Sequence, residues 1–486
     1  MAAVVVVGGG ITGLAAAHRL VESGSDDVLV LEASQAAGGQ IRTERHGEYL
    51  FEGGPDALVA QKPEGVALCQ RLGIGGELRE LTARGGTQIW HRGRLHRVPD
   101  GFLMMAPTRL APMLRSQLFT WRGKLRMLRE PSVPARAAGV NDESLASFVT
   151  RRFGREVLDR VAEPVIAGLF TADAERLSLR MTMPNFLDLE ERDGSVMRGL
   201  RRVAVERRGH RPFGHGTGRG GFVAVASGLS SIVDALISRL PSGAVRTGAR
   251  VSSVSAEPAD GGWSVRLAGG ETLPAGAVLF ACNGEDAARA LFALDASLAG
   301  RLRRLRYASC ATVNVVYRRA DVCSRLDGNG FFVPRGERLP ILACSYVSEK
   351  FEGRAPAGMA VFRAFLGGAM HPDALDADDA QLARATHESL RRILDVTSDP
   401  VLSRVHRSPS AMPQFDVGAR ELVAAIRQGA DAHPGLFLAG SVAGAFGLPD
   451  CIRSGEDAAA RAAAYLTQRQ GAPASAWVAY HANQNA

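Results

Sequence analysis

Glycines near the N-terminus have the spacing of a turn that binds the pyrophosphate of a dinucleotide. An apolar run, Val4 to Val7, leads directly into the glycine-rich segment 8–13. In such turns Gly8 would permit the reversal from strand to helix, Gly10 would leave room for the pyrophosphate, and Gly13 would let the helix pack close to the strand. The segment therefore indicates a dinucleotide site.

A second apolar run ends in an acidic residue that could bind the ribose of the same ligand. This run, Val28 to Leu31, follows a helix expected from Ile11 to about Ser23, and Glu32 comes about twenty positions after Gly13. The helix would direct its N-terminal amides at the phosphates, and Glu32 would accept hydrogen bonds from the ribose. A glycine-rich loop alone is more often a buried turn, but its combination with Glu32 favours the dinucleotide site.

Further glycines permit close contact between backbone and ligand. Gly38-Gly39 follows the second strand, Arg42 could reach a phosphate, and 51–55 reads Phe-Glu-Gly-Gly-Pro. Near the C-terminus an apolar strand over 436–439 and a glycine-containing loop precede an Ala-rich helix that begins near Leu448. That helix offers a second N-terminus to a ligand.

The composition is that of a globular protein with room for two or three domains. The 486 residues are 46% hydrophobic and 22% charged, and the net charge of +8 comes from arginine, because only three residues are lysine. Codon bias accounts for most of these arginines, and attraction to anionic surfaces or substrates is the functional alternative. We expect no nucleic-acid partner, and a homodimer stays open.

Cysteine and hydropathy patterns point to the cytoplasm. The six cysteines are scattered without histidines at metal-ligand spacing, so we expect reduced thiols and no metal. The first apolar run lacks a preceding basic segment and is broken by glycines, unlike a signal peptide. No apolar stretch reaches the roughly 18 residues that span a bilayer.

The segment 101–129 combines apolar and basic residues without any acid. It includes Phe102, Trp121 and several methionines and leucines, interleaved with arginines and Lys124. Such a segment can lie on an anionic membrane, here the inner face of the cell membrane, or form a helical hairpin packed on the core with a solvated basic face. A second basic run, 198–219, is glycine-rich at its end, and we expect a loop there.

These motifs resemble those of a known family. The chain is similar to the FAD-dependent amine oxidase and phytoene desaturase superfamily, and within it to bacterial protoporphyrinogen and coproporphyrinogen oxidases. The resemblance covers roughly residues 3–466 and is carried by the glycine turn with Glu32, by 52–55, by Glu163-Pro-Val-Ile-Ala-Gly-Leu-Phe170 with Leu177-Ser178, and by 447–455.

The resemblance implies FAD as the cofactor. Its expected contacts are Gly8, Gly10, Gly13, Glu32, Gly38, Gly39, Arg42, Gly54, Pro55, Val251, Gly440, Ser441, Leu448, Pro449 and Ile452. Within this set the first glycines would hold the pyrophosphate, Glu32 the ribose, and Val251 the adenine. Gly54 and Pro55 would lie beside the isoalloxazine ring.

For the substrate, the resemblance implies a tetrapyrrole held between Phe332 and Phe365, with Gly168 and Ala172 near the reactive edge of the flavin. The two phenylalanines could equally be core aromatics. Two departures from the family concern the substrate: Thr87 stands where some members have an arginine for a propionate, and Ala172 stands where a glycine is usual.

The implied reaction needs no catalytic side chain, because the flavin carries the redox chemistry. We expect hydride transfer from a bridge carbon of a porphyrinogen to FAD N5, reoxidation by oxygen with release of hydrogen peroxide, and three such rounds in haem synthesis. A flavin desaturase or amine oxidase for another substrate, a nicotinamide enzyme, and a non-catalytic tetrapyrrole-binding flavoprotein are the alternatives.

Together these features predict an α/β fold with a discontinuous Rossmann-like FAD-binding domain. We assign 1–58, 222–293 and 400–468 to that domain. A substrate-binding domain with a second sheet would take 59–100 and 294–399, a helical insertion that could meet a membrane would take 101–221, and 469–486 would be a loose tail.

Overall fold

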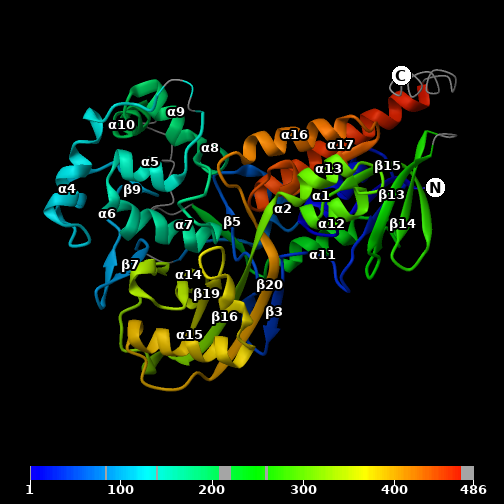
Figure 1. Ribbon diagram of the computed structural model, residues 1–486. Coiled ribbons are helices and arrows are strands. Elements are labelled where there is room, and N and C mark those ends of the chain that lie inside the picture. The colour runs from blue at the N-terminus through cyan, green and yellow to red at the C-terminus, as the bar shows by residue number, and fades with distance from the viewer. Residues whose placement is uncertain are drawn as a thin grey trace.

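The computed structural model describes residues 2–82, 85–137, 139, 141–206, 221–257 and 261–471. It has three parts (Figure 1). The first lobe is a mixed sheet between helices at the right of the picture, the second sheet with helix α15 lies at the bottom, and the helical lobe lies at the upper left.

The first lobe is built around β1 (Ala2–Val7), whose valines are buried. β1 runs parallel to β2 and β15, and the strand order is β12-β2-β1-β15-β14-β13, with β21 also paired to β15. Apolar strands such as these are typical of a sheet covered on both faces. The other strands are β2 (Val28–Leu31), β12 (Val245–Arg246), β13 (Val251–Glu257), β14 (Gly262–Leu267), β15 (Thr272–Phe280) and β21 (Leu436–Leu438).

Helices cover the two faces of this sheet because alternate valines of β1 point to opposite sides. Val4 and Val6 share a core with α1, α2, α11 and α17, whereas Val5 and Val7 share a core with α12, α13 and α16. The bounds are α1 (Ile11–Glu22), α2 (Pro63–Arg71), α11 (Ser230–Ser238), α12 (Gly284–Leu291), α13 (Ala296–Arg303), α16 (Ala419–Asp431) and α17 (Leu448–Gly471).

The second sheet has the order β20-β16-β19-β18-β17-β7-β8 and is antiparallel except at the β17 to β7 pair. Helix α15 (Asp379–Leu394) packs on one face through Leu382, Leu390 and Ile393. The other face contacts residues 52–54 and, at Phe332 and Ala343, Gly168 of the helical lobe. The strands are β7 (Gln88–His91), β8 (Arg94–Arg97), β16 (Arg306–Arg318), β17 (Gly330–Phe332), β18 (Ile341–Tyr346), β19 (Met359–Gly367) and β20 (Leu402–Gln414).

Short strands connect the two sheets. β3 pairs with β4, and β11 lies between β5 and β6, so residues near 222 return to the chain near 58 and 78. Their bounds are β3 (Thr43–His46), β4 (Tyr49–Glu52), β5 (Leu58–Val59), β6 (Leu78–Glu80) and β11 (Phe222–Val225), and helix α14 spans Val347–Lys350.

The helical lobe begins with a small hairpin and continues as short helices around an apolar core that includes Phe148, Phe153 and Leu187. Within it, a π-helical turn, η3 (Leu158–Ala162), runs into α7. The elements are β9 (Phe102–Leu103), β10 (Ala106–Pro107), α3 (Leu110–Arg115), α4 (Trp121–Leu128), α5 (Leu145–Arg152), α6 (Arg155–Val157), α7 (Glu163–Phe170), α8 (Leu179–Thr182), α9 (Pro184–Asp193) and α10 (Val196–Glu206).

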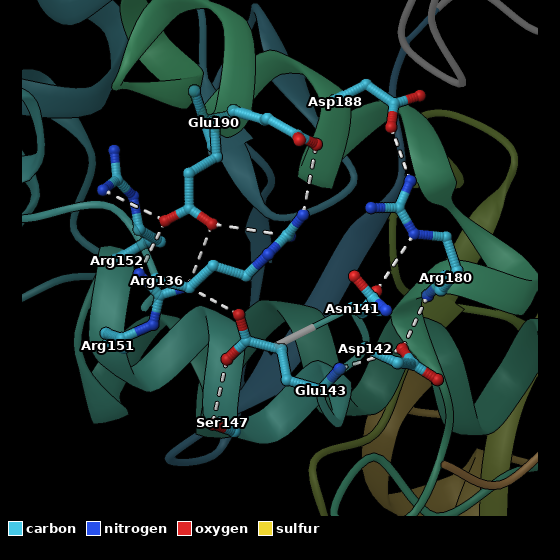
Figure 2. Close-up of polar contacts among 12 residues, drawn as sticks. Arg136, Asn141, Asp142, Glu143, Ser147, Arg151, Arg152, Arg180, Asp188 and Glu190 are labelled. Carbon is cyan, nitrogen blue, oxygen red and sulfur yellow. Dashed lines mark hydrogen bonds and ion pairs between the residues drawn. The ribbon is translucent and has the colours of Figure 1, made fainter. Parts of the chain in front are cut away.

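A buried ion network ties α5 to α9 in this lobe (Figure 2). Arg152 is fully buried, pairs with Glu130, and lies 3.3 Å from Glu190. Arg151 binds Glu190 at 2.6 Å and Glu143 at 2.5 Å. Glu130 in turn accepts hydrogen bonds from the backbone N–H groups of Val196 and Met197 at the start of α10. The charges are therefore compensated inside the core.

The structure corrects three sequence-based expectations. Residues 198–206, expected in a loop, belong to α10, because Val196, Met197 and Leu200 form a buried face that begins before the basic run. Residues 207–219 lie outside the described residues. β20 joins the second sheet, so the predicted boundary at 400 is wrong for 402–414. Helix α17 continues to Gly471, past the predicted end at 468, and 472–486 lie outside the described residues.

Segment 101–129 has features of both alternatives that its sequence allows. Phe102, Met105, Met113 and Met127 are buried in the core of the helical lobe, as in a packed hairpin. On α4, however, Trp121, Leu125 and Leu128 are exposed by 69%, 56% and 36%. In the described part of the chain, no helix is both long and apolar enough to cross a bilayer.

Candidate functional site

The glycine turn forms an open cradle at the start of α1. Gly10 is the N-cap of α1 and makes no side-chain capping bond, so the first amides of the helix are available to an anion. A Cβ at Gly10 would have no protein atom nearer than Gly39 Cα at 3.9 Å, whereas a Cβ at Gly13 would lie 1.9 Å from the Gly8 carbonyl oxygen. Gly13 therefore serves packing, and Gly10 leaves space.

The second glycine pair lies against this cradle. The Gly38 N–H donates to the Gly9 carbonyl oxygen at 2.8 Å, and Gly10 and Gly38 form a β-bridge. Gly39 has a φ of 61°, and a Cβ there would lie 3.1 Å from Gly10 Cα. The two turns thus lie in close backbone contact, and no side chain separates them.

Glu32 lies at the edge of the cradle. Its Oε2 accepts from the Gly9 N–H at 2.8 Å, and its Oε1 accepts from the N–H and Oγ of Ser34 at 2.7 Å. A carboxylate offers about four acceptor positions, so Glu32 can still accept from a ligand hydroxyl. The Glu32 carbonyl oxygen accepts from the Ala249 N–H at 2.8 Å, which brings Val251 to the same edge.

The C-terminal motif meets the N-terminal turn. Gly455 packs so closely on α1 that a Cβ there would lie 2.2 Å from the Thr12 carbonyl oxygen, and a Cβ at Gly440 would lie 3.1 Å from Thr12 Oγ1. Ser441 Oγ forms a hydrogen bond of 2.9 Å with the Tyr307 hydroxyl. Ile452 is buried and Leu448 begins α17, so both ends of the chain contribute to one site.

The loop that contains Gly54 and Pro55 connects this cradle to the second sheet. Gly54 packs against Gln40, where a Cβ would lie 1.8 Å from the carbonyl oxygen, and the Gly53 N–H donates to the Arg42 carbonyl oxygen at 2.8 Å. From β16, Thr312 donates to the Gly53 carbonyl oxygen at 2.8 Å. Gly38, Gly39, Arg42, Gly54 and Pro55 are therefore neighbours.

Buried charges around this loop were missed in the sequence. Arg354 lies 3.5 Å from Glu52, and Lys350 binds Asp56 at 2.8 Å. Burial alone would raise the pKa of Asp56, but the charges of Arg363 and Lys350 outweigh it and hold this pKa below its usual range. Lys350 is one of three lysines and Asp56 follows Pro55, yet no local spacing links them.

The two predicted substrate phenylalanines lie on the same face of the second sheet. Phe332 of β17 and Phe365 of β19 both pair in register with Ala343 of β18. Two strand spacings separate their Cα atoms by about 10 Å, so the rings stand on either side of the small Ala343 side chain. Gly168 of α7 covers this position, because a Cβ there would lie 2.3 Å from the Phe332 ring and 3.0 Å from Ala343 Cβ.

The other predicted substrate residues lie farther into the protein. Ala172 is 2% exposed and packs in the core of the helical lobe, whereas Thr87 precedes β7 and is half-buried. At the other end of α7, burial raises the pKa of Glu163 to about 7, although the N–H and charge of Arg335 act in the opposite direction. A π-helical turn immediately before such a residue is often found at functional sites.

The cradle fits a dinucleotide, since it combines the N-terminus of α1, glycines without side chains and the Glu32 carboxylate. On the second sheet, Asn314 Oδ1 and Arg363 Nε are buried and have no hydrogen-bond partner among the described residues, so a ligand with donors and acceptors could bind them. If FAD is bound there, it supplies the electron acceptor for an oxidation.

Comparisons with known proteins identify the family of this chain. The family described as flavin containing amine oxidoreductase matches residues 11–463. The coproporphyrinogen III oxidase of Bacillus subtilis is 30% identical over 95% of this chain and 98% of its own length. Protoporphyrinogen oxidase 1 of Spinacia oleracea chloroplasts is 28% identical over 96% of this chain and 84% of its own.

Solved structures show the same fold. A protein from Exiguobacterium sp. 255-15, assigned as a protoporphyrinogen oxidase, superposes with a TM-score of 0.81 at 28% identity over 94% of this chain and 98% of its own. Cyclohexylamine oxidase from Brevibacterium oxydans reaches 0.68 at 17% identity over 96% and 99%, which concerns the fold alone. The chain thus belongs to the flavin-containing amine oxidoreductase family and is an FAD-dependent oxidoreductase.

Proposed function

We propose that this protein oxidises a porphyrinogen, protoporphyrinogen IX or coproporphyrinogen III, to the porphyrin in haem synthesis, with oxygen as acceptor and release of hydrogen peroxide. The observation that carries the proposal is the similarity to the Bacillus oxidase, 30% over nearly the full length of both chains. The site is compatible with it, because an apolar face lies next to the loop of Gly54.

In this proposal the chain binds and orients its substrate and supplies no acid or base. Phe332 and Phe365 would provide the apolar face for the macrocycle, beside Gly168 of α7, which packs against Phe332 and Ala343. Arg335 is exposed and lies three residues after Phe332. It would pair with a substrate propionate, the role of the arginine that some family members have at the position of Thr87. A shielded apolar face also keeps solvent from the reacting carbon.

Truncation of the two phenylalanines tests the proposal. Phe332→Ala and Phe365→Ala should lower porphyrinogen turnover per bound FAD by roughly 1 to 3 kcal/mol in transition-state stabilisation, with FAD content unchanged. The matched control is Phe331→Ala, because Phe331 is 2% exposed on the opposite face of β17. It should cost about 3 to 5 kcal/mol of stability and leave normalised turnover intact.

The same assay separates the alternatives. Thr87 and Ala172 favour a second candidate, a flavin desaturase or amine oxidase for another substrate. Peroxide formation with amines but with neither porphyrinogen would support that reading. Flavin-loaded protein that binds a porphyrin and turns over no substrate would indicate a tetrapyrrole-binding flavoprotein.

We also propose that α4 contacts an anionic lipid surface. Trp121, Leu125 and Leu128 follow one another at helical spacing on its exposed side, and α4 lies at the outer edge of the helical lobe (Figure 1). Arg122 and Arg129 are exposed on the same helix and at its end. An apolar stripe flanked by basic residues is typical of a helix that lies in the membrane interface.

Sedimentation with vesicles tests this contact. The protein should bind anionic vesicles at low salt and lose binding at high salt, since each arginine near the surface contributes about 1 kcal/mol. Trp121→Ser with Leu125→Ser should abolish binding. The control is Phe292→Ser, an exposed aromatic (54%) beside Arg303 in the first lobe, which should bind normally. Equal recovery of all three proteins would contradict the proposal.

A further inference from the structure

Arg363 of β19 is buried beneath the loop of Gly53, Gly54 and Pro55. Its side chain is 4% exposed, and its Nη1 donates to the carbonyl oxygens of Gly54 at 3.1 Å and Glu52 at 3.4 Å. Together with the bond from Thr312 to Gly53, side chains of the second sheet bind three successive carbonyl groups of the loop. The position of the loop is therefore set by the second sheet.

The same guanidinium contacts the proposed substrate face. Its Cζ lies 4.7 Å from the centroid of the Phe365 ring, and the two residues share one face of β19 because they are two positions apart. Phe365 is half-buried, whereas the residues on the opposite face of β19 lie in the core under α15. One side chain thus contacts both the loop and the ring.

Charge compensation lets this guanidinium stay buried. Arg363 Nη2 lies 3.5 Å from Asp56 Oδ2, the carboxylate that also binds Lys350. A planar guanidinium can bind carbonyl and carboxylate groups at its edge while its face contacts an aromatic ring. An ammonium group is a point charge and does not combine these contacts, so the geometry is specific to arginine.

We propose that Arg363 is a positioning residue that couples the Gly53–Pro55 loop, beside the flavin, to Phe365, and so sets the distance between cofactor and substrate. The cofactor half of this statement rests on bound FAD and on the proposed position of the loop beside its isoalloxazine ring. The Phe365 half rests on the proposed function.

Arg363→Lys and Arg363→Met test the coupling, with Arg354→Met as the matched control. Arg354 is as deeply buried and belongs to the same charge cluster, but it binds Glu52 and the Val225 carbonyl oxygen, and no contact joins it to Gly54 or Phe365 among the described residues. Loss of a buried charge is therefore common to Arg363→Met and the control, whereas loss of the contacts with Gly54 and Phe365 is not. Arg363→Lys keeps the positive charge, so it still tests the coupling if Arg363→Met does not fold.

The first readout needs no substrate. Both Arg363 variants should bind FAD but change the visible circular dichroism of the bound flavin, and Arg354→Met should give the wild-type spectrum at equal FAD content. Wild-type spectra for both Arg363 variants, or the same spectral change in Arg354→Met, would overturn the cofactor half.

The second readout uses porphyrinogen. Turnover per bound FAD should fall about 10- to 100-fold in Arg363→Lys, mostly in kcat, because misplacement by about 1 Å has such effects. In the double variant Arg363→Lys with Phe365→Ala, the loss of transition-state stabilisation should be smaller than the sum of the losses in the two single variants. Additive losses would overturn the coupling. If wild-type protein oxidises no porphyrinogen, the proposed function fails, while the spectral result still decides the cofactor half.

Discussion

The glycine cradle and the helical lobe place polar groups inside the protein in opposite ways. In the cradle the polar groups are backbone amides and one carboxylate, and the side chains are absent, as at Gly10 and Gly39. In the helical lobe they are long side chains, such as Arg152 and Glu190 in Figure 2. Arg152, Glu130 and Glu190 neutralise one another at 0% to 1% exposure.

The difference concerns what each region can bind. The cradle keeps donors free, so a bound anion completes it and its stability need not depend on side-chain pairs. The charges of the helical lobe already satisfy one another, and a buried pair has value only when both partners remain. The first region is arranged for a ligand, whereas the second compensates its charges within the protein.

Glycine substitutions in the cradle should have the largest effects, on FAD binding at Gly10 and on folding at Gly13. Gly10 has φ −74° and ψ 179°, which valine tolerates, and there is space for a Cβ. Gly10→Val should therefore fold but weaken FAD binding at least about a hundredfold, or about 2.8 kcal/mol. Gly13→Ala should lose folding and FAD together, because its Cβ would strike the Gly8 carbonyl. Flavin absorbance and far-UV circular dichroism measure both. Normal FAD content in Gly10→Val would contradict the site.

Breaking the ion network should affect stability alone. Arg152→Met leaves Glu130 buried without its cation, while Glu190 keeps Arg151, and should cost about 3 to 5 kcal/mol of unfolding free energy. Denaturant unfolding measures this loss. FAD content per folded molecule should stay at the wild-type level, since no described contact joins Arg152 to the cradle. A parallel loss of FAD would show that the two regions are coupled.

A smaller, pH-dependent effect should come from Glu163, at the start of α7 in the helical lobe. Its pKa of about 7 lies above the ordinary 4.5, so the folded protein retains a proton that the unfolded chain releases. The contribution of Glu163 to the free energy of unfolding is fully present below pH 4.5, and it is lost as the pH rises through 7. Between pH 5 and 8, wild type should lose about 2 to 3 kcal/mol more unfolding free energy than Glu163→Gln. Parallel pH profiles would contradict the raised pKa.

The sequence by itself determined the features that depend on local spacing. Strand, turn and helix over 2–22, the strand that ends before Glu32, and the strands over 306–367 follow from apolar runs and glycines within a few residues. The family also followed from motifs. Helix α10 was missed because basic residues hid a buried face that tertiary packing supplies. The end of α17 was missed because its last residues carry no apolar pattern.

Only the tertiary structure decided which distant residues meet. Gly440 and Gly455 contact Thr12, and Phe332 and Phe365 flank Ala343, through helix packing and strand register. The ion pairs around Arg152 and Asp56 join segments that are far apart in the chain. The strength of such an ion pair depends on its burial, and burial depends on the whole fold. No local pattern in the sequence could therefore reveal these pairs.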